Sequence, residues 1–96
     1  MSHYRLAERA DADLLAAFQD GMEWFGLAQA RRYNAELKHC FQLLAENPRM
    51  GRLIETIRPS VRRHVHKSHA ILYEIDGSSV VILAIVPARS VRKFKL

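Results

Sequence analysis

The sequence predicts an α+β domain, with a short N-terminal strand and an antiparallel two-helix hairpin ahead of a three-stranded antiparallel β-meander. Apolar residues recur every three or four positions through the first half of the 96-residue chain, which is typical of amphipathic helices. Beyond residue 60 they alternate with polar residues or run continuously, as they do in strands. Because the two patterns occupy separate halves of the chain, a doubly wound fold is not expected. The length suits one domain over residues 1–96.

An opening strand is expected at residues 4–6, where two apolar residues flank Arg5. The first helix follows, because an apolar stripe recurs at spacings of four, four and three. Its members are Leu14, Phe18, Met22 and Phe25. Gly21 is expected to weaken this helix by roughly 1 kcal/mol relative to alanine. Gly26 comes directly after the stripe and is expected to end the helix, since glycine accepts the left-handed conformation there.

The second helix has the clearest pattern, a three-four alternation broken only by Asn34. Its apolar positions are Leu27, Ala30, Leu37, Phe41 and Leu44. Cys40 is the one cysteine of the chain, so it is interpreted as a packing residue of this helix. Pro48 is expected to end the helix near Asn47, because proline lacks an amide hydrogen. Two amphipathic helices with a short connection form an antiparallel hairpin whose apolar side can cover one face of a sheet.

The second half of the chain predicts the meander. Residues 61–67 and 71–75 alternate, so each of these strands should bury one face. Asp76 and Gly77 form the turn into the last strand. Residues 79–86 are apolar on both faces, which places this strand in the middle of the sheet. The remaining segment, 48–60, is predicted to be a loop.

The net charge of +5 is unevenly distributed. Residues 1–57 carry seven Lys/Arg and eight Asp/Glu, whereas residues 58–96 carry eight and two. Such a field favours an acidic partner, either a protein or a nucleic acid, with a merely solvated rim as the alternative. No apolar run approaches the ~20 residues that cross a bilayer, and the first residues do not resemble a secretory signal. A cytoplasmic protein without membrane association is therefore expected.

Short motifs along the chain carry a family resemblance. In order, they are Tyr4-x-Leu6 with Ala10, Asp13 and Leu14; Phe25-Gly26 with Gln29-Ala30, Tyr33 and Leu37; the segment from Leu44 to Gly51; and Arg62-Arg63 with His69, Ile71 and Tyr73. Together and at this spacing they resemble the ParE branch of the RelE/ParE superfamily of bacterial toxins. The resemblance spans nearly the whole chain.

The resemblance implies the toxin of a type II toxin–antitoxin pair, silenced by a small ParD-like antitoxin whose C-terminal segment wraps around it. ParE members are associated with poisoning DNA gyrase, whereas RelE members cut mRNA in the ribosome. We expect a gyrase inhibitor that acts by binding. The alternatives are a ribosome-dependent endoribonuclease of the RelE type and a non-toxic relative that only binds a regulatory partner.

The residues offer little for catalysis. RNA cleavage next to a 2′-hydroxyl needs a general base, a general acid and cations. After Tyr73 the only candidates for acid or base are Glu74 and Asp76, so no catalytic residue is assigned. A reduced site built from Arg63, His69 and Tyr73 stays open.

The histidines do not predict a metal site. His64 and His66 lie two apart, on one face of a strand, which suits a pair of metal ligands. No third ligand follows at a recognisable spacing, so neither a metal nor a cofactor is expected. His69, at the turn into the next strand, is interpreted as a residue that orients the backbone.

A hairpin leaning on a sheet leaves a groove that an antitoxin segment can fill. The candidate antitoxin-binding residues are an apolar wall of Leu15, Phe18, Met22, Trp24 and Tyr33 and a charged rim of Arg58, Arg62 and Arg63. The alternative for the apolar set is the internal core, which is favoured for Phe18. The candidate target-binding residues surround Phe94 near the C-terminus: Arg89, Arg92, Lys93 and Lys95. A frayed tail is their alternative. Direct nucleic-acid binding would need a recognition helix or a stacking platform, and neither is seen in the sequence. Direct binding to nucleic acid is therefore left open rather than expected.

Overall fold

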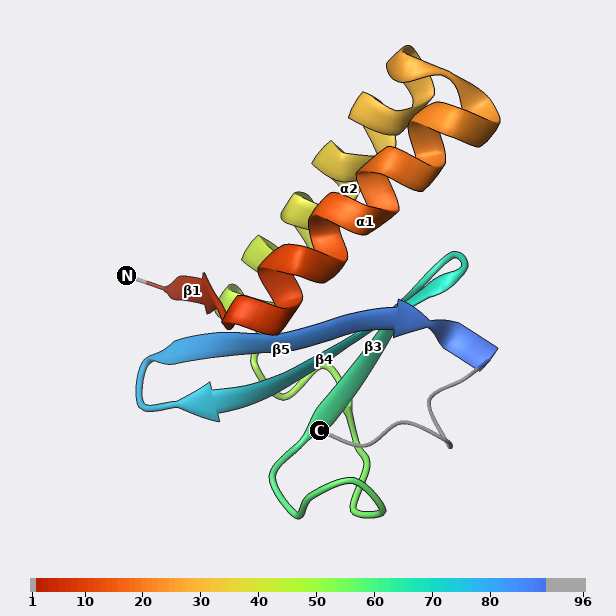
Figure 1. Cartoon of the computed structure of the whole chain (residues 1–96). Helices are drawn as coiled ribbons and strands as arrows, with labels where there is room; N and C mark the ends of the chain where they lie inside the picture. The colour runs from red at the N-terminus through yellow and green to blue at the C-terminus, as the bar shows by residue number, and fades with distance from the viewer. Residues whose placement is uncertain (1, 90–96) are drawn as a thin grey trace.

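The computed structural model describes residues 2–89. Its elements are β1 (His3–Leu6), α1 (Glu8–Phe25), α2 (Leu27–Glu46), β2 (Arg52–Leu53), β3 (Arg62–His66), β4 (His69–Asp76) and β5 (Ser79–Pro87). Figure 1 shows the two helices side by side as a hairpin that rests on one face of the sheet. The predicted α+β order of strand, helical hairpin and meander is confirmed.

The strands form one five-stranded sheet in the order β1-β5-β4-β3-β2. The meander β3-β4-β5 is antiparallel. β5 lies inside the sheet rather than at its edge, as predicted, because β1 pairs parallel with its outer side from His3↔Ser79 to Leu6↔Ile82. β2 is a strand within the segment that was predicted to be a loop. It is only two residues long, which is too short for an alternating pattern to predict.

One glycine ends the first helix and begins the second. Gly26 has φ 89° and ψ 164°, a region that is essentially restricted to glycine. Its N–H donates to the carbonyl oxygen of Met22 at 3.1 Å, and its own carbonyl accepts from the N–H of Ala30 at 3.1 Å. The predicted end of α1 is therefore correct, although the backbone is extended rather than left-handed helical.

The helices approach closely at Gly21, which was predicted to be a weak point of α1. A Cβ at this position would lie 3.4 Å from the Cβ of Ala30 on α2. A Cβ would therefore just reach van der Waals contact with α2, so glycine fits the close approach of the two helices, and a side chain larger than alanine would crowd Ala30.

The carboxylate of Asp13 ties α1 to the sheet. Its Oδ2 accepts a hydrogen bond from the N–H of Ile85 at 3.0 Å. This N–H lies on β5 beyond the last β1 pair, Leu6↔Ile82, so no strand partner is present to accept it. Asp13 therefore fixes the position of the helix over the free edge of β5.

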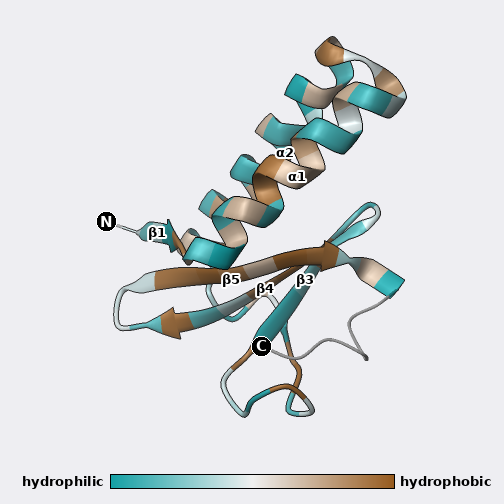
Figure 2. Cartoon of the chain, in the orientation of Figure 1, coloured by the Kyte–Doolittle hydropathy of each residue, from teal (hydrophilic) through white to brown (hydrophobic). Residues whose placement is uncertain are grey.

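The core has two layers, one on each face of the sheet. The main core lies between the sheet and the hairpin and comprises Ala10, Leu14, Leu37, Cys40, Phe41, Leu44, Ile71, Tyr73, Val80, Ile82 and Ile85. A second cluster lies on the opposite face, under Ile54 and Ile57 of the 48–60 segment, and comprises Val61, Ala70, Leu72, Ala84 and Val86. Figure 2 shows the hydrophobic residues concentrated along β4 and β5. The packing role of Cys40 is confirmed.

The second cluster corrects the prediction for the middle strand. Alternation indicated that β4 buries Ile71, Tyr73 and Ile75 on one face only. In the structure Ala70 and Leu72 are also fully buried on the other face, whereas Ile75 is exposed near the end of the strand. The loop covers the second face, and its contact with β4 has no local signal in the sequence.

Only the first half of the predicted α1 stripe belongs to the core. Leu14 is buried and Phe18 is half-buried, but Met22 and Phe25 are exposed. The reason is geometric, because the far half of the hairpin projects beyond the sheet (Figure 1). The exposed residues at the end of α1 therefore have nothing to cover them within the described chain.

Tyr73 holds the segment that follows α2. Its buried hydroxyl accepts from the N–H of Gly51 at 2.8 Å and donates to the carbonyl of Pro48 at 2.7 Å. A Cβ at Gly51 would collide with this hydroxyl, so only glycine fits. Arg62 adds a bond of 2.7 Å from Nη1 to the carbonyl of Gly51. Pro48 and Gly51, at the end of the Leu44–Gly51 motif, thus have a structural reason. Within residues 2–89, no helix is long and apolar enough to span a membrane.

Candidate partner-binding site

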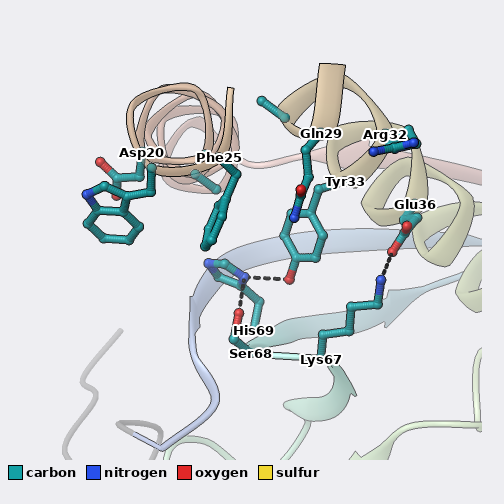
Figure 3. Close-up of a pocket in the computed structure, with 13 residues that line it drawn as sticks. Asp20, Phe25, Gln29, Arg32, Tyr33, Glu36, Lys67, Ser68 and His69 are labelled. Atoms are coloured by element: carbon teal, nitrogen blue, oxygen red, sulfur yellow. Dashed lines mark hydrogen bonds and ion pairs between the residues drawn. The ribbon is translucent and has the colours of Figure 1, made fainter. Parts of the chain in front are cut away.

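A cavity of about 560 Å³ lies where the projecting half of the hairpin meets the turn between β3 and β4. We call it the hairpin cavity. Its aromatic lining comprises Trp24, Phe25, Tyr33 and His69, and its polar lining comprises Asp20, Gln29, Arg32, Glu36, Lys67 and Ser68. Figure 3 shows Phe25 and Tyr33 pointing from the helices toward His69 on the sheet. The cavity therefore joins residues from both halves of the chain.

Tyr33 forms the floor of the cavity together with the turn. Its Oη lies 2.7 Å from Nδ1 of His69 and 3.3 Å from the carbonyl oxygen of His66. The ring centroids of Tyr33 and His69 are 5.4 Å apart. The Oγ of Ser68 lies 3.4 Å from the same Nδ1 atom. These contacts fasten α2 to the β3–β4 turn.

Both partners in the floor are uncharged at neutral pH. Burial raises the pKa of the Tyr33 phenol above its ordinary value. Burial also lowers the pKa of His69, and the neighbouring His66 lowers it further, while Asp20 opposes the shift. A neutral phenol and a neutral imidazole can each donate one hydrogen bond and accept another.

A second connection between α2 and the turn is ionic. The Oε1 of Glu36 lies 2.8 Å from Nζ of Lys67 and 2.8 Å from Nε2 of His66. The hydrogen bond from Lys67, and after it that from His66, lowers the pKa of Glu36. Lys67 occupies the turn with φ 52°, in the left-handed region. Its Nζ lies 5.9 Å from the centroid of the Tyr33 ring, so it covers one side of the cavity floor.

A family model described as "ParE toxin of type II toxin-antitoxin system, parDE" matches residues 4–92. The chain belongs to this ParE toxin family. Among its relatives, Toxin ParE1 of Mycobacterium tuberculosis (strain H37Rv) is 34% identical over 80 residues, which are 83% of this chain and 82% of the relative. Toxin ParE1 of Caulobacter vibrioides is 35% identical over 86 residues, which are 90% and 88% of the two chains.

A solved structure titled "Chromosomal ParDE TA system from P. aeruginosa" has the same fold. Its TM-score is 0.78 at 22% sequence identity, and the match covers 91% of this chain and 96% of that one. The likeness supports the α+β architecture that was predicted for this ParE-family chain.

The predicted apolar wall of this ParE-family chain is divided in the structure. Trp24 and Tyr33 line the hairpin cavity. Leu15 and Met22 are exposed on α1 and do not line it, and Phe18 is half-buried. The five residues thus belong to two surfaces, because helical periodicity assigns a face to each residue but does not show where the other elements end.

The predicted charged rim does not form. Arg62 lies opposite Tyr73 and Arg63 lies opposite Leu72, and cross-strand neighbours share a face, so the two arginines point to opposite faces of the sheet. Arg62 is bonded to the backbone at Gly51.

Arg58, the third arginine of that set, also has a local partner. Its Nη2 lies 2.6 Å from Oε1 of Glu74, and the other oxygen of that carboxylate, Oε2, accepts a hydrogen bond from Ser60. The backbone of Arg63 is paired within the sheet, but its guanidinium makes no hydrogen bond or ion pair with the other residues in 2–89. It is therefore the member of the predicted rim with a cation available to a partner.

The reduced nuclease site is not assembled. Tyr73 is fully buried, and its hydroxyl is used by the backbone at Pro48 and Gly51. His69 is four residues away on β4, which is roughly 13 Å along a strand. Arg63 lies on the other face of the sheet. The three candidate side chains therefore cannot act on one phosphate.

The histidines have structural partners. His64 and His66 share a face of β3 as predicted, but His66 is bonded to Glu36. Burial, and after it the nearby His66, lowers the pKa of His64. Within residues 2–89, no group of three or more His, Cys, Asp or Glu could hold a metal ion.

His69 differs from its predicted role. Its side chain contacts the side chains of Tyr33 and Ser68 rather than the backbone of the turn. The backbone there is fixed by Ser68, whose carbonyl accepts from the N–H of Ala88 at 2.9 Å.

The structure describes part of the predicted target-binding set. Arg89 is exposed after the end of β5. The other three members, Arg92, Lys93 and Lys95, lie outside the described residues.

Sequence reasoning missed Glu36, Lys67 and Ser68 as cavity residues. Glu36 follows Tyr33 by three positions and so shares its helix face, which is the one local signal that was present. Lys67 and Glu36 are 31 positions apart, and no pattern in the sequence connects them.

Proposed function

We propose that this ParE-family chain is the toxin of a type II pair, that it inhibits DNA gyrase by binding, and that a ParD-like antitoxin neutralises it. The observation that carries the proposal is the family match across residues 4–92. The name Toxin ParE1 borne by two relatives and the ParDE title of the structural neighbour support the pairing with an antitoxin. Gyrase is a cytoplasmic enzyme, so we propose that the protein acts in the cytoplasm.

Binding rather than covalent chemistry is supported by the described side chains. The phenol of Tyr73 is enclosed and satisfied by backbone groups, so it has no proton to exchange with a substrate. Arg63, His69 and Tyr73 are too far apart to share one substrate. An inhibitor that acts by binding needs only a complementary surface.

The proposed antitoxin surface is the projecting half of the hairpin. Leu15 and Trp24 expose 58% and 69% of their areas, and Met22 exposes 40%. Exposed apolar side chains mark interaction sites, and these lie on two surfaces of the hairpin, with Trp24 at the cavity and Leu15 and Met22 outside it. An amphipathic antitoxin segment would cover them together with Phe18 and Tyr33. Its acidic residues would meet Arg63 only where the segment wraps around to the opposite face of the sheet, because Arg63 lies opposite Leu72 of the second cluster.

The proposed target-binding segment is the basic C-terminal end, with Arg89, Arg92, Lys93 and Lys95. Its charge favours contact with gyrase or with the DNA that gyrase holds.

ATP-dependent supercoiling of relaxed plasmid by purified gyrase tests the proposal. The protein is titrated into the reaction with and without a ParD-like antitoxin. We expect inhibition or trapped cleaved DNA, relieved by the antitoxin. No effect at micromolar protein would contradict gyrase as the target, and specific mRNA cuts in translating ribosomes would then favour the RelE-type activity.

Two charge reversals test the surfaces. R92E/K93E is expected to weaken gyrase inhibition, and R31E/K38E, which reverses two exposed cations on α2, is the matched control. Inhibition by R92E/K93E equal to that of the parent would exclude the C-terminal segment. Separately, Arg63→Glu is expected to weaken antitoxin binding, and unchanged affinity would remove Arg63 from the antitoxin surface.

A further inference from the structure

The hairpin cavity has the walls of a site for a flat ring. Four ring systems line it, those of Trp24, Phe25, Tyr33 and His69. Its volume of about 560 Å³ lies within the range of roughly 300–1,000 Å³ typical of ligand pockets. Trp24 and Phe25 expose 69% and 62% of their areas, so the rings at the mouth are uncovered within the described chain. Two large exposed aromatic side chains beside a cavity are typical of a binding site rather than of a core.

The floor of the cavity is polar and neutral. Tyr33 and His69 hydrogen-bond each other through Oη and Nδ1, which leaves Nε2 of His69 without a partner in residues 2–89. The side-chain amide of Gln29 also makes no hydrogen bond with the described residues. An aliphatic side chain would cover these groups without pairing them, which costs free energy. A ring with a polar edge, as in tyrosine or tryptophan, would pair with them.

The charges of the cavity do not favour a nucleic acid. Asp20 and Glu36 are balanced by Arg32 and Lys67, and Glu36 already pairs with Lys67. A phosphate backbone is attracted by a net positive field, and this cavity has none even though the whole chain carries +5. Asp20 and Arg32 form no ion pair within residues 2–89, so one free charge of each sign is available to a peptide. The balance therefore favours a protein partner.

We propose that the hairpin cavity is the anchor site for the antitoxin, and that it receives one tyrosine or tryptophan side chain of the antitoxin's wrapping segment. The ring lies against Trp24 and Tyr33, and its polar edge bonds to the floor at His69. The inference rests on the proposed function, since the occupant is the antitoxin. It ranks the surface, because the cavity supplies the main energy and the exposed stripe on α1 contributes less.

A fragment titration tests the ring preference. Trp24 is the one tryptophan of the chain, so its indole N–H gives a single NMR signal. N-acetyl-tyrosinamide is expected to shift this signal at low millimolar concentration, and N-acetyl-leucinamide is expected to shift it less. The antitoxin should displace the tyrosine probe. A probe that stays bound in the complex, or a single-stranded oligonucleotide that shifts the signal in place of the amide, would overturn the proposal.

Two neighbouring alanines give a matched pair of variants. Ala17 lines the cavity, and Ala17→Leu places extra volume inside it. Ala16 is exposed on the same helix outside the lining, so Ala16→Leu adds the same group elsewhere. We expect the Ala17→Leu variant to bind the antitoxin about tenfold or more weakly, and the Ala16→Leu variant to match the parent. Equal affinities for the two variants would overturn the proposal.

Trp24→Ala covers the case in which Ala17→Leu perturbs folding, because Trp24 is largely exposed. We expect a similar loss of antitoxin affinity, and parent-like affinity would also overturn the anchor. The proposed function is tested separately, by gyrase inhibition and antitoxin binding of the parent protein. If the parent protein binds its antitoxin, and the Trp24→Ala and Ala17→Leu variants bind it as tightly as the parent does, the anchor site is refuted but the proposed function is not.

Discussion

Tyr73 connects the sheet to the segment after the second helix through one hydroxyl group. This group accepts a hydrogen bond from Gly51 and donates one to Pro48, and both partners are backbone groups that lose water on folding. The burial of Tyr73 is complete, so water cannot replace the hydroxyl without entering the core. Tyr73, which the sequence offered as a candidate catalytic residue, therefore has a structural role.

Tyr73→Phe is expected to lower the free energy of unfolding by about 1–3 kcal/mol, because it leaves the N–H of Gly51 and the carbonyl of Pro48 unpaired. Urea denaturation followed by circular dichroism measures the change. Tyr4→Phe is the control, since Tyr4 packs on Phe41 and its hydroxyl has no hydrogen bond in residues 2–89. Equal stability of the two variants would contradict the role of the Tyr73 hydroxyl.

His69 makes stability depend on pH. Burial lowers the pKa of His69 in the folded state below the ordinary value of about 6.5 in the unfolded state. The unfolded chain therefore takes up the proton first, and the stability present above pH ~6.5 is lost as pH falls toward the folded pKa. His64 has a pKa lowered in the same direction. Glu36 acts in a lower window, below the ordinary glutamate pKa of about 4.3.

We expect the melting temperature to fall as the pH is lowered from 7.5 to 5.5, and to fall less in the His69→Gln variant. Differential scanning calorimetry across this range measures both slopes. His39→Gln, on the exposed side of α2, is the control and should keep the parent's slope. A slope that His69→Gln leaves unchanged would exclude this residue as the source.

At the scale of elements, two glycines with positive φ play different roles. Gly77 has φ 61°, in the turn between β4 and β5, where asparagine is tolerated. Gly26 has φ 89° and ψ 164°, a combination that side chains exclude. A Cβ at either position would contact no neighbouring atom, so the cost of substituting the two glycines differs only through backbone strain.

The same substitution therefore has unequal effects at the two positions. Gly26→Asn is expected to destabilise the protein by about 1–3 kcal/mol, and Gly77→Asn by clearly less. Thermal unfolding of both variants measures the difference. Equal losses of stability in the Gly77→Asn and Gly26→Asn variants would contradict the claim that the backbone conformation of Gly26 requires glycine more strictly than that of Gly77.

At the scale of the whole molecule, charge and apolar surface are separated. The excess of cations belongs to residues 58–96, whereas five of the nine large hydrophobic side chains that are exposed within residues 2–89 lie on the helical hairpin: Leu15, Met22, Trp24, Phe25 and Leu27. A wrapping partner meets both, so its charges should set the rate of encounter and its apolar residues the lifetime of the complex.

We expect the association rate constant of the antitoxin to fall steeply as NaCl rises from 50 to 500 mM, and its dissociation rate constant to change little. Stopped-flow association and competitive dissociation measure the two constants. An association rate that does not depend on salt would contradict steering by the basic half of the chain.

The sequence by itself determined the elements, their order and most of their ends. Helical periodicity and alternation act over a few neighbouring residues and correctly predicted the two helices and the strands of the meander. Gly26 and Pro48 correctly predicted where the helices end. The interior place of β5 was also predictable, because a strand that is apolar on both faces is typical of the inside of a sheet that is covered on both faces. The family motifs, read along the chain, predicted the family that the comparisons show.

Only the tertiary structure decided which residues form the site. Tyr33 and His69 are 36 positions apart in the sequence. They meet because the hairpin lies across the sheet and projects beyond it (Figure 1). The same geometry exposes Met22, which periodicity had assigned to the core stripe, and places Arg62 and Arg63 on opposite faces. Local patterns assign a face to each residue, but the packing of distant elements decides what that face meets.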